Sequence, residues 1–265
     1  NITRDTKIPV YIDSISKIIF LESYLRSNDH YKENASGNPE DFFFVKHGYY
    51  LDDKRRFNQF ENYLKAADHV LDVGCEWGGF INLAREHCKI ISGVELNDSC
   101  LKYLKKNFKS ANFNNNIDNV KYQPDLITSF HVLEHIPDQV ETLKKIHRAL
   151  ADNGTLILEV PHAEDFLVQT IDLPEFREFT FWSEHLVLHT KSSLEFILKE
   201  SGFSEIEVFG YQRYGFTNHL GWLKDKQPNG HEKYSYLEDE KLDTDYKNCR
   251  VRTNTSDTLI AVAKK

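Results

Sequence analysis

A glycine-rich turn joins a buried strand to a helix within residues 69–80. Residues 70–73 supply the apolar, largely β-branched run of a strand that is covered on both faces. Gly74 permits a sharp turn, and Gly78 and Gly79 leave no Cβ between the backbone and a ligand. This strand, turn and helix predict a site for a small ligand at the end of the strand.

A second feature is Glu95, the acid that ends another apolar strand at residues 89–96. A carboxylate at the tip of the second strand of a βαβ unit is placed to accept the two hydroxyls of a ribose. Glu76 stands where a dinucleotide site carries glycine, and a carboxylate there would repel a pyrophosphate. No Gly-Lys-Ser/Thr follows, which excludes a phosphate loop. S-adenosylmethionine has a ribose and no phosphate, so it fits.

These residues carry a resemblance to a known family. Leu71-Asp72-Val73-Gly74-Cys75-x-x-Gly78 with Glu95 resembles the cofactor site of class I S-adenosylmethionine-dependent methyltransferases. The family usually has glycine at position 76, so Glu76 departs from its pattern. On this resemblance, the residues expected to bind S-adenosylmethionine are Asp72, Gly74, Cys75, Gly78, Gly79, Glu95, Leu96, Phe130 and His131.

Three later segments sharpen the resemblance. Residues 125–138 resemble the fourth-strand segment of a subgroup that includes ubiquinone-biosynthesis O-methyltransferases and many sugar-modifying enzymes. Residues 156–161 resemble its fifth strand, and residues 181–186 resemble a later element. The resemblance extends over roughly residues 40 to 265.

Histidines are the candidate catalytic bases. Methyl transfer is an in-line displacement at a sulfonium carbon, so the enzyme must align the reacting atoms and exclude water. A hydroxyl nucleophile gains from a general base, and histidine suits neutral pH. His131 ends the fourth predicted strand, near the expected methyl group, and is the first candidate. His185, flanked by Trp182 and Leu186, is the second. The alternatives are packing on the cofactor for His131 and simple burial for His185.

A metal is the competing interpretation for the segment that follows His131. In the ubiquinone-type enzymes the matching segment can serve metal binding, with a glutamate where this chain has His131. That substitution weakens the metal hypothesis, although His131, Glu134 and His135 could still supply three ligands. A turn that caps the next helix is the favoured explanation for Glu134 and His135. We therefore predict no metal.

Polar residues after the fifth and sixth predicted strands are the candidates for substrate recognition. Arg213 could pair with a phosphate or a carboxylate. A solvated loop is the alternative. The predicted substrate-binding residues are His162, Trp182, Arg213, Tyr214, Asn218 and His219.

Strands and helices alternate along the chain as βαβ units require. The pattern predicts strands at 70–73, 89–96, 125–131, 155–160, 205–211 and 258–262, with a further strand somewhere within 112–121. It predicts helices around 57–64, at 78–87, after Asn97 or Asp98, at 138–150 and from Thr190 to Gly202.

The fold class expected from this pattern is α/β, with a doubly wound, mostly parallel, seven-stranded sheet of the Rossmann-like methyltransferase type. Its ligand must lie at the carboxyl ends of the strands. Residues 1–40 are expected to form an N-terminal helical extension, because Ile12, Ile15, Ile18, Ile19 and Leu25 fall near helical spacing. Residues 41–265 form the methyltransferase domain, with aromatic-rich insertions at about 161–189 and 211–256 to cover the substrate.

Composition excludes several functions. The chain of 265 residues has 41 acids and 33 bases, a net charge of −8, so a nucleic-acid partner is not expected. The 4 cysteines lack CxxC spacing, which indicates reduced thiols in a cytoplasmic protein. No apolar run approaches the length of a membrane span, and no signal-peptide pattern is present. A small-molecule substrate is expected, and a homodimer is left open.

The sequence thus predicts an enzyme that O-methylates a small polar metabolite. The resemblance favours a sugar, a nucleotide sugar or a phosphorylated precursor in surface-polysaccharide biosynthesis. The alternatives are an N- or C-methyltransferase of a small molecule, or a degenerate cofactor-binding subunit, for which Glu76 would be the supporting feature.

Overall fold

The computed structural model describes residues 2–23, 32, 39 and 49–265. Its centre is a seven-stranded sheet in the order β5-β4-β3-β6-β7-β10-β9. Strands β5 to β7 of that order pair in parallel, whereas β10 runs antiparallel to both β7 and β9. The strands are β3 (His69–Val73), β4 (Ile90–Val94), β5 (Asn112–Asn114), β6 (Leu126–Phe130), β7 (Thr155–Pro161), β9 (Ser204–Tyr211) and β10 (Thr258–Lys264).

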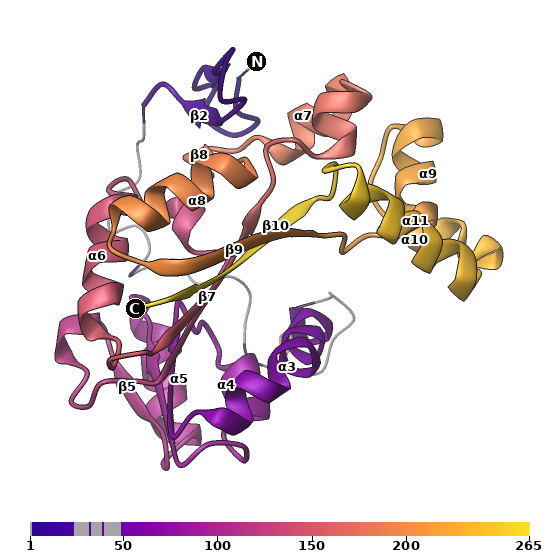
Figure 1. Ribbon diagram of the computed structural model, residues 1–265. Helices are drawn as coiled ribbons and strands as arrows, with labels where there is room; N and C mark the ends of the chain where they lie inside the picture. Colours follow the sequence, from indigo (N-terminus) through magenta and orange to yellow (C-terminus); the bar gives the residue numbers. More distant parts are fainter. Residues whose placement is uncertain (1, 24–31, 33–38, 40–48) are drawn as a thin grey trace.

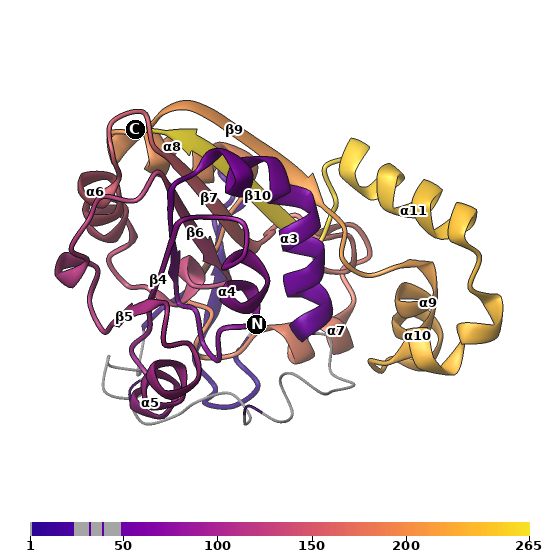
Figure 2. The ribbon, with the colours of Figure 1, turned by 90° about the horizontal axis from the view of Figure 1, so that it is seen from below.

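Helices cover both faces of this sheet, so the domain has three layers (Figures 1 and 2). One apolar core joins the sheet to α3, α4 and α5, and a second joins it to α6 and α8. These helices are α3 (Tyr49–Ala66), α4 (Gly79–Ala84), α5 (Asp98–Asn107), α6 (Gln139–Ala149) and α8 (Lys191–Glu200). Among the described residues, no helix combines the length and apolar composition needed to cross a membrane.

The predicted doubly wound α/β fold is confirmed, and so is each predicted strand. The third strand is β5, which lies in the asparagine-rich segment. It has three residues and forms one edge of the sheet, and only the Phe113 side chain is buried. The polar composition of this edge strand explains why its position was not predicted.

The predicted starts of α5 and α8 are confirmed by hydrogen bonds, whereas the helix predicted to reach residue 87 ends at Ala84. The Asn97 side chain accepts from the amides of Ser99 and Cys100 at the start of α5. Thr190 and Ser193 form a capping box at the start of α8, and Gly202 follows that helix with a φ of 101°. Such bonds satisfy amide groups that have no partner within the helix.

The prediction of an N-terminal helix is wrong for residues 2–23. Residues 10–12 and 19–21 form β1 (Val10–Ile12) and β2 (Ile19–Leu21), which pair antiparallel. Asp13 accepts from the amides of Ile15 and Ser16, so it closes a turn where a helix was expected. Ile15 sits in that turn and is 91% exposed. Leu25 lies outside the described residues.

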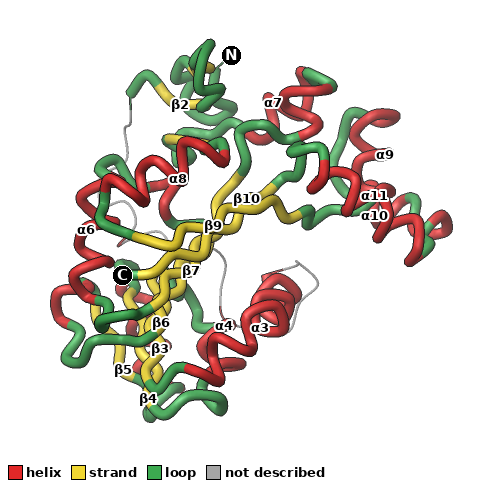
Figure 3. The backbone as a smooth tube through the Cα atoms, in the orientation of Figure 1, coloured by secondary structure: helices red, strands yellow, loops and turns green. Residues whose placement is uncertain are grey.

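A second, three-stranded sheet has the order β1-β2-β8, with β8 at Val187–Leu188. It therefore joins the N-terminal segment to the first insertion. That insertion also holds η3 (Phe166–Thr170) and α7 (Pro174–Thr180). The second insertion forms a helical group beyond the end of β9 (Figure 3), comprising α9 (Phe216–Asp225), α10 (Gly230–Lys233), η4 (Ser235–Leu237) and α11 (Glu240–Arg252).

Candidate active site

The carboxyl ends of the parallel strands bring the predicted residues to one edge of the sheet. Gly74 follows β3, Glu95 follows β4 and His131 follows β6. The His131 amide donates to the carbonyl oxygen of Glu159, in β7, at 2.8 Å. This common edge follows from parallel pairing, which places all carboxyl ends on the same side.

The turn after β3 depends on backbone conformations that glycine adopts readily. Gly74 has a φ of 78° and Gly78 has a φ of 82°. A Cβ on Gly74 would lie 2.3 Å from Val132 Cγ2, and one on Gly78 would lie 2.6 Å from Leu104 Cδ2. Gly78 is therefore required for its backbone conformation and for packing on α5. The expectation that its missing Cβ gives room to a ligand is wrong.

Glu95 ties the turn to the end of β4. Its two carboxylate oxygens accept from the amides of Glu76 and Asn97, each at 2.8 Å. Glu76 adopts a φ of 45°, and its backbone rather than its side chain makes this contact. Burial raises the pKa of Glu95. The carboxylate retains lone pairs for two further donors.

Asp72 lies in β3, immediately before the turn. The Thr128 hydroxyl donates to Asp72 Oδ1 at 2.7 Å, and burial raises the pKa of Asp72 to about 7. Burial likewise raises the pKa of Asp53, on α3, to about 6. Two buried acids of elevated pKa favour a cationic ligand, because a nearby positive charge stabilises the carboxylate.

The other predicted cofactor residues line or support this edge. Burial raises the pKa of the Cys75 thiol, which fits a packing role. Phe130 packs against Phe80 with ring centroids 5.1 Å apart and is half-buried. Leu96 is half-buried after β4, and Gly79 is the buried first residue of α4.

His131 occupies a strained position between two carboxylates. Its φ is 55°, a conformation that L-residues rarely adopt. Its Nδ1 lies 3.0 Å from Glu134 Oε1, and its Nε2 lies 3.1 Å from Glu159 Oε1. Burial acts to lower the pKa of His131, but the hydrogen bonds to Glu134 and Glu159 outweigh it and raise the pKa.

This arrangement does not support His131 as the general base. An acid lies against each ring nitrogen of His131, so both nitrogens are engaged and the charged form of the ring is favoured. A base must offer a free lone pair to the proton that it removes. His131 is therefore better described as a group held between Glu134 and Glu159 at the end of β6.

Glu159 anchors a group of buried charges that sequence analysis missed. The Arg55 Nη2 lies 2.8 Å from Glu159 Oε1, and Arg56 Nη2 lies at the same distance. Burial acts to raise the pKa of Glu159, but Arg56 and its other cationic neighbours hold it well below its usual range. The available signal was an acid inside an apolar strand, at residues 156–160.

Arg213 extends this group from the end of β9. Its guanidinium pairs with Asp52 on α3, and its Nη1 lies 3.4 Å from His131 Nε2. It also lies over the ring of Tyr214, which is exposed. The structure therefore brings Arg213 and Tyr214, both predicted for substrate binding, next to His131.

His185 lies among aromatic and polar rings beside the same edge. Its ring centroid is 5.1 Å from that of His135 and 5.2 Å from that of Trp182. Burial, and then His135, lower the pKa of His185 to about 3. A histidine with this pKa is neutral but too weakly basic to serve well as a general base near neutral pH.

Three of these residues form the only cluster with metal-ligating potential that the described part of the chain contains. Ligand atoms of Glu134, His135 and His185 lie within 4.8 Å of one another. This set differs from the predicted alternative, in which His131 took the place of His185. His131 instead donates to Glu134.

The remaining predicted substrate residues lie within the packing of the second insertion. His162 Nδ1 lies 2.9 Å from the Ser256 carbonyl oxygen, and His219 Nδ1 lies 2.6 Å from the Tyr246 hydroxyl. Burial lowers the pKa of His219 to about 4. Asn218 is buried with its amide 3.2 Å from His231 Nδ1. The alternative of a solvated loop, which concerned the residues after β9, is wrong for Asn218 and His219, and His162 is also buried.

Comparison with known proteins agrees with this geometry. A family model described as a methyltransferase domain matches residues 45–208. The ubiquinone biosynthesis O-methyltransferase of Coxiella burnetii is 28% identical over 96 residues, which are 33% of this chain and 41% of that protein. An uncharacterised protein of Methanocaldococcus jannaschii is 29% identical over 157 residues, 56% of this chain and 66% of that protein.

Solved structures share the fold. A methyltransferase from Archaeoglobus fulgidus that depends on S-adenosylmethionine has a TM-score of 0.56 at 20% identity, covering 85% of this chain and 97% of that one. The N-methyltransferase NodS from Bradyrhizobium japonicum WM9, in complex with S-adenosylhomocysteine, has a TM-score of 0.51 at 14% identity, covering 86% and 96%.

Proposed function

Because the chain belongs to the S-adenosylmethionine-dependent methyltransferases, we propose that it methylates a small polar metabolite that carries an anionic group. The observation behind this proposal is the pair formed by Arg213 and His131 at the end of β6. S-adenosylmethionine supplies an electrophilic methyl group on a sulfonium. The protein must hold the acceptor in line with that group and keep water away.

The cofactor residues are assigned from the chemistry of their groups. Glu95 accepts the ribose hydroxyls, and Asp72 faces the cationic amino-acid end beside Gly74 and Gly78. A hollow of about 510 Å³ next to the end of β5 accommodates the adenine. It is lined by Asp98, Leu101, Lys102, Lys105, Phe113, Asn114 and Asn115. The Glu95 amide donates to the Asn114 carbonyl oxygen at 3.0 Å, so ribose and base sites adjoin.

The acceptor site is assigned to the space beside His131, Arg213 and Trp182. A guanidinium and an imidazolium together suit a phosphate or a carboxylate. A sugar phosphate or nucleotide sugar has both that anion and the hydroxyl to be methylated. Surface-polysaccharide biosynthesis is the setting that the resemblance to sugar-modifying enzymes favours, and a cytoplasmic location agrees with it.

An amine acceptor is the second candidate. Both ring nitrogens of His131 are engaged by carboxylates, and the pKa of His185 is lowered to about 3, so neither histidine is poised to take a proton. An amine reaches its reactive neutral form without a base in the site, and alignment then suffices. This observation favours N-methylation over C-methylation.

A methyl-transfer screen with mass detection tests the proposal. Matched acceptors should include nucleotide sugars, phosphorylated metabolites, their neutral sugar counterparts and their amino-sugar counterparts. We expect transfer to the anionic acceptors, with Arg213→Gln raising their KM and leaving that of neutral acceptors unchanged. Equal rates with neutral and anionic acceptors would contradict the anionic-substrate proposal.

A further inference from the structure

The N-terminal segment, residues 2–23, lies against the first insertion. Asp5 Oδ1 accepts from the Ser183 amide at 3.0 Å, and Asp5 Oδ2 accepts from the Ser183 hydroxyl at 2.5 Å. The Arg4 amide donates to the Phe181 carbonyl oxygen at 2.9 Å. Ser183 and Phe181 are both buried, so these contacts fix the backbone of the insertion from outside.

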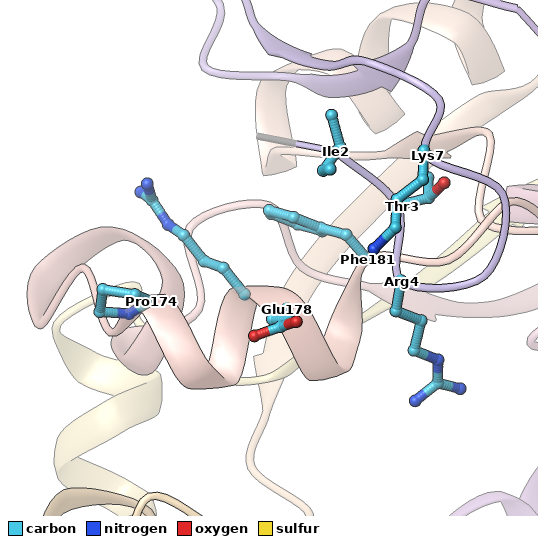
Figure 4. A pocket seen from close by; sticks show the side chains of 8 residues that line it. Ile2, Thr3, Arg4, Lys7, Pro174, Glu178 and Phe181 are labelled. Carbon is cyan, nitrogen blue, oxygen red and sulfur yellow. The ribbon is translucent and has the colours of Figure 1, made fainter.

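The side chain of Arg4 extends from the N-terminal segment to the ring of Trp182, beside the active site. Its guanidinium lies 5.3 Å from the centroid of Trp182, and Trp182 packs on His185. Figure 4 shows Arg4 at a hollow of about 200 Å³ between the N-terminal segment and α7. That hollow is lined by Ile2, Thr3, Arg4, Lys7, Pro174, Arg177, Glu178 and Phe181. The N-terminal segment therefore packs, through Arg4, against the paired rings of Trp182 and His185 from the outside.

Backbone pairing continues the connection to the turn after β6. Strand β2 pairs with β8, and the Leu21 amide donates to the Leu186 carbonyl oxygen at 3.0 Å. The Leu186 amide in turn donates to the Glu134 carbonyl oxygen at 2.8 Å. Glu134 is the residue whose carboxylate accepts from His131. An unbroken series of hydrogen bonds thus links the N-terminal segment to His131.

A second link runs through His135. Its Nδ1 lies 2.9 Å from the Glu184 carbonyl oxygen. This contact joins Glu184, which follows Ser183, to His135, which follows Glu134. Segment 181–186 is consequently fastened on one side by Asp5 and on the other by the Glu134–His135 turn. A shift of this segment would move the rings of Trp182 and His185 together with that turn.

We propose that the N-terminal segment forms the outer wall of the methyl-acceptor site and that Asp5 is a positioning residue. Asp5 holds segment 181–186 against the Glu134–His135 turn and so sets the orientation of His131. This wall lies outside residues 45–208, the part that matches the family model. The inference rests on the proposed function, because the acceptor site is the one assigned above.

The test compares Asp5→Ala with Asp13→Ala, a control in the same segment. Asp13 closes the turn between β1 and β2, where its side chain accepts from the amides of residues 15 and 16. We expect Asp5→Ala to speed amide exchange at Ser183 and Leu186 by about tenfold, the scale of a lost hydrogen bond to a charged group. It should also raise the acceptor KM by a similar factor. Affinity for S-adenosylmethionine, measured by calorimetry, should change by less than about twofold.

Two further variants keep the result specific. Asp5→Asn retains an acceptor for the Ser183 amide and should restore most of the protection. Asp5→Ala combined with Ser183→Ala should be no worse than Asp5→Ala alone, because the two side chains act as one unit. Thermal unfolding of each variant identifies any that fails to fold.

Amide exchange and the NMR titration of His131 need no acceptor, so they separate this inference from the proposed function. Faster exchange and a shifted His131 titration in Asp5→Ala support the wall even if the acceptor proves different. Unchanged exchange and titration in a folded Asp5→Ala variant would overturn the inference, whatever the acceptor is. An equal effect of Asp13→Ala on segment 181–186 would overturn the specific role of Asp5.

Discussion

At the scale of single residues, the charge on His131 determines what chemistry the site can do. A histidine at the end of β6 was expected to accept a proton from the acceptor. Its two carboxylate partners, Glu134 and Glu159, instead engage both ring nitrogens and favour its charged form. Under the proposed function, His131 and Arg213 bind an anionic group of the acceptor, and the acceptor proton is removed by another group or needs no base.

Glu95→Ala should weaken the binding of S-adenosylmethionine by about 1–3 kcal/mol, the scale of lost hydrogen bonds to a charged group. Calorimetry measures the change directly. Glu141→Ala is the matched control, since this acid lies on the exposed face of α6 and pairs with Arg148. If Glu95→Ala binds S-adenosylmethionine with unchanged affinity, Glu95 does not bind the ribose.

His131→Ala should lower the maximal rate by at least about 10²-fold, the scale of a misplaced acceptor rather than of a lost base, while leaving cofactor affinity nearly intact. The same loss is predicted for His185→Ala, which contributes to the wall beside Trp182. Turnover at saturating acceptor measures both. If both variants keep near-full rate, no histidine takes part in the chemistry, and N-methylation by alignment alone becomes the leading hypothesis.

The stability contributed by His131 should depend on pH. Hydrogen bonds to the two acids raise its pKa in the folded protein, so the folded state binds the proton more tightly than the unfolded state. That contribution is complete below the unfolded value of about 6.5 and is lost as pH rises through the folded pKa. The difference in unfolding free energy between wild type and His131→Gln should therefore shrink with rising pH. A difference that grows with pH would contradict the assigned charge.

At the scale of elements, the site depends on how α3 is attached to the sheet. Arg55 and Arg56, on one turn of α3, both pair with Glu159 in β7. Arg56 also lies over the ring of Phe130, at 4.8 Å from its centroid. Helix α3, which precedes β3, thus forms one wall of the candidate active site.

Glu159→Gln should destabilise the protein by about 3–5 kcal/mol, because it leaves two arginines without their buried partner. Urea unfolding measures this loss. An exposed pair such as Glu141 and Arg148 provides the comparison, and breaking it should cost less than about 1 kcal/mol. The same variant should lower the pKa of His131. If the loss of stability in Glu159→Gln equals that from breaking the Glu141–Arg148 pair, the buried charges do not attach α3 to the sheet.

At the scale of the whole molecule, the N-terminal segment and the two insertions surround one edge of the sheet. The N-terminal segment joins β8 of the first insertion in a small sheet, and the second insertion begins at the end of β9. Under the proposed function, parts far apart in sequence therefore enclose the acceptor together. Variation in these parts can change the acceptor while the cofactor site stays the same.

Turnover should proceed without added divalent metal. By the resemblance to the ubiquinone-type enzymes, His131 stands where those enzymes carry a glutamate. Its Nδ1 lies 3.0 Å from Glu134 Oε1, so this oxygen already has a hydrogen-bond partner. The rate in EDTA should match the rate without it, and added zinc or magnesium should not increase it. Activity abolished by EDTA and restored by magnesium would overturn this prediction and would identify Glu134, His135 and His185 as ligands.

Local sequence patterns determined the cofactor side of this protein. The strand, the turn at Gly74 and the acid at Glu95 are neighbours along the chain or lie at equivalent strand ends, so periodicity and turn chemistry sufficed to predict them. The third strand, β5, was placed only approximately because its polar residues show no such periodicity. The N-terminal helix was predicted wrongly because isoleucines near helical spacing also suit strands when a turn at Asp13 separates them.

Only the tertiary structure shows which residues surround His131, where the acceptor is proposed to bind. No local pattern pointed to residues 52–56 or to Glu159 as neighbours of His131, and only folding brings them together around it. The charge of a histidine depends on partners that lie far away in sequence, and the separation of 103 positions between Arg56 and Glu159 leaves no local trace of that contact. Pairing energies and pKa shifts arise from distance and burial in three dimensions, which a linear pattern does not contain.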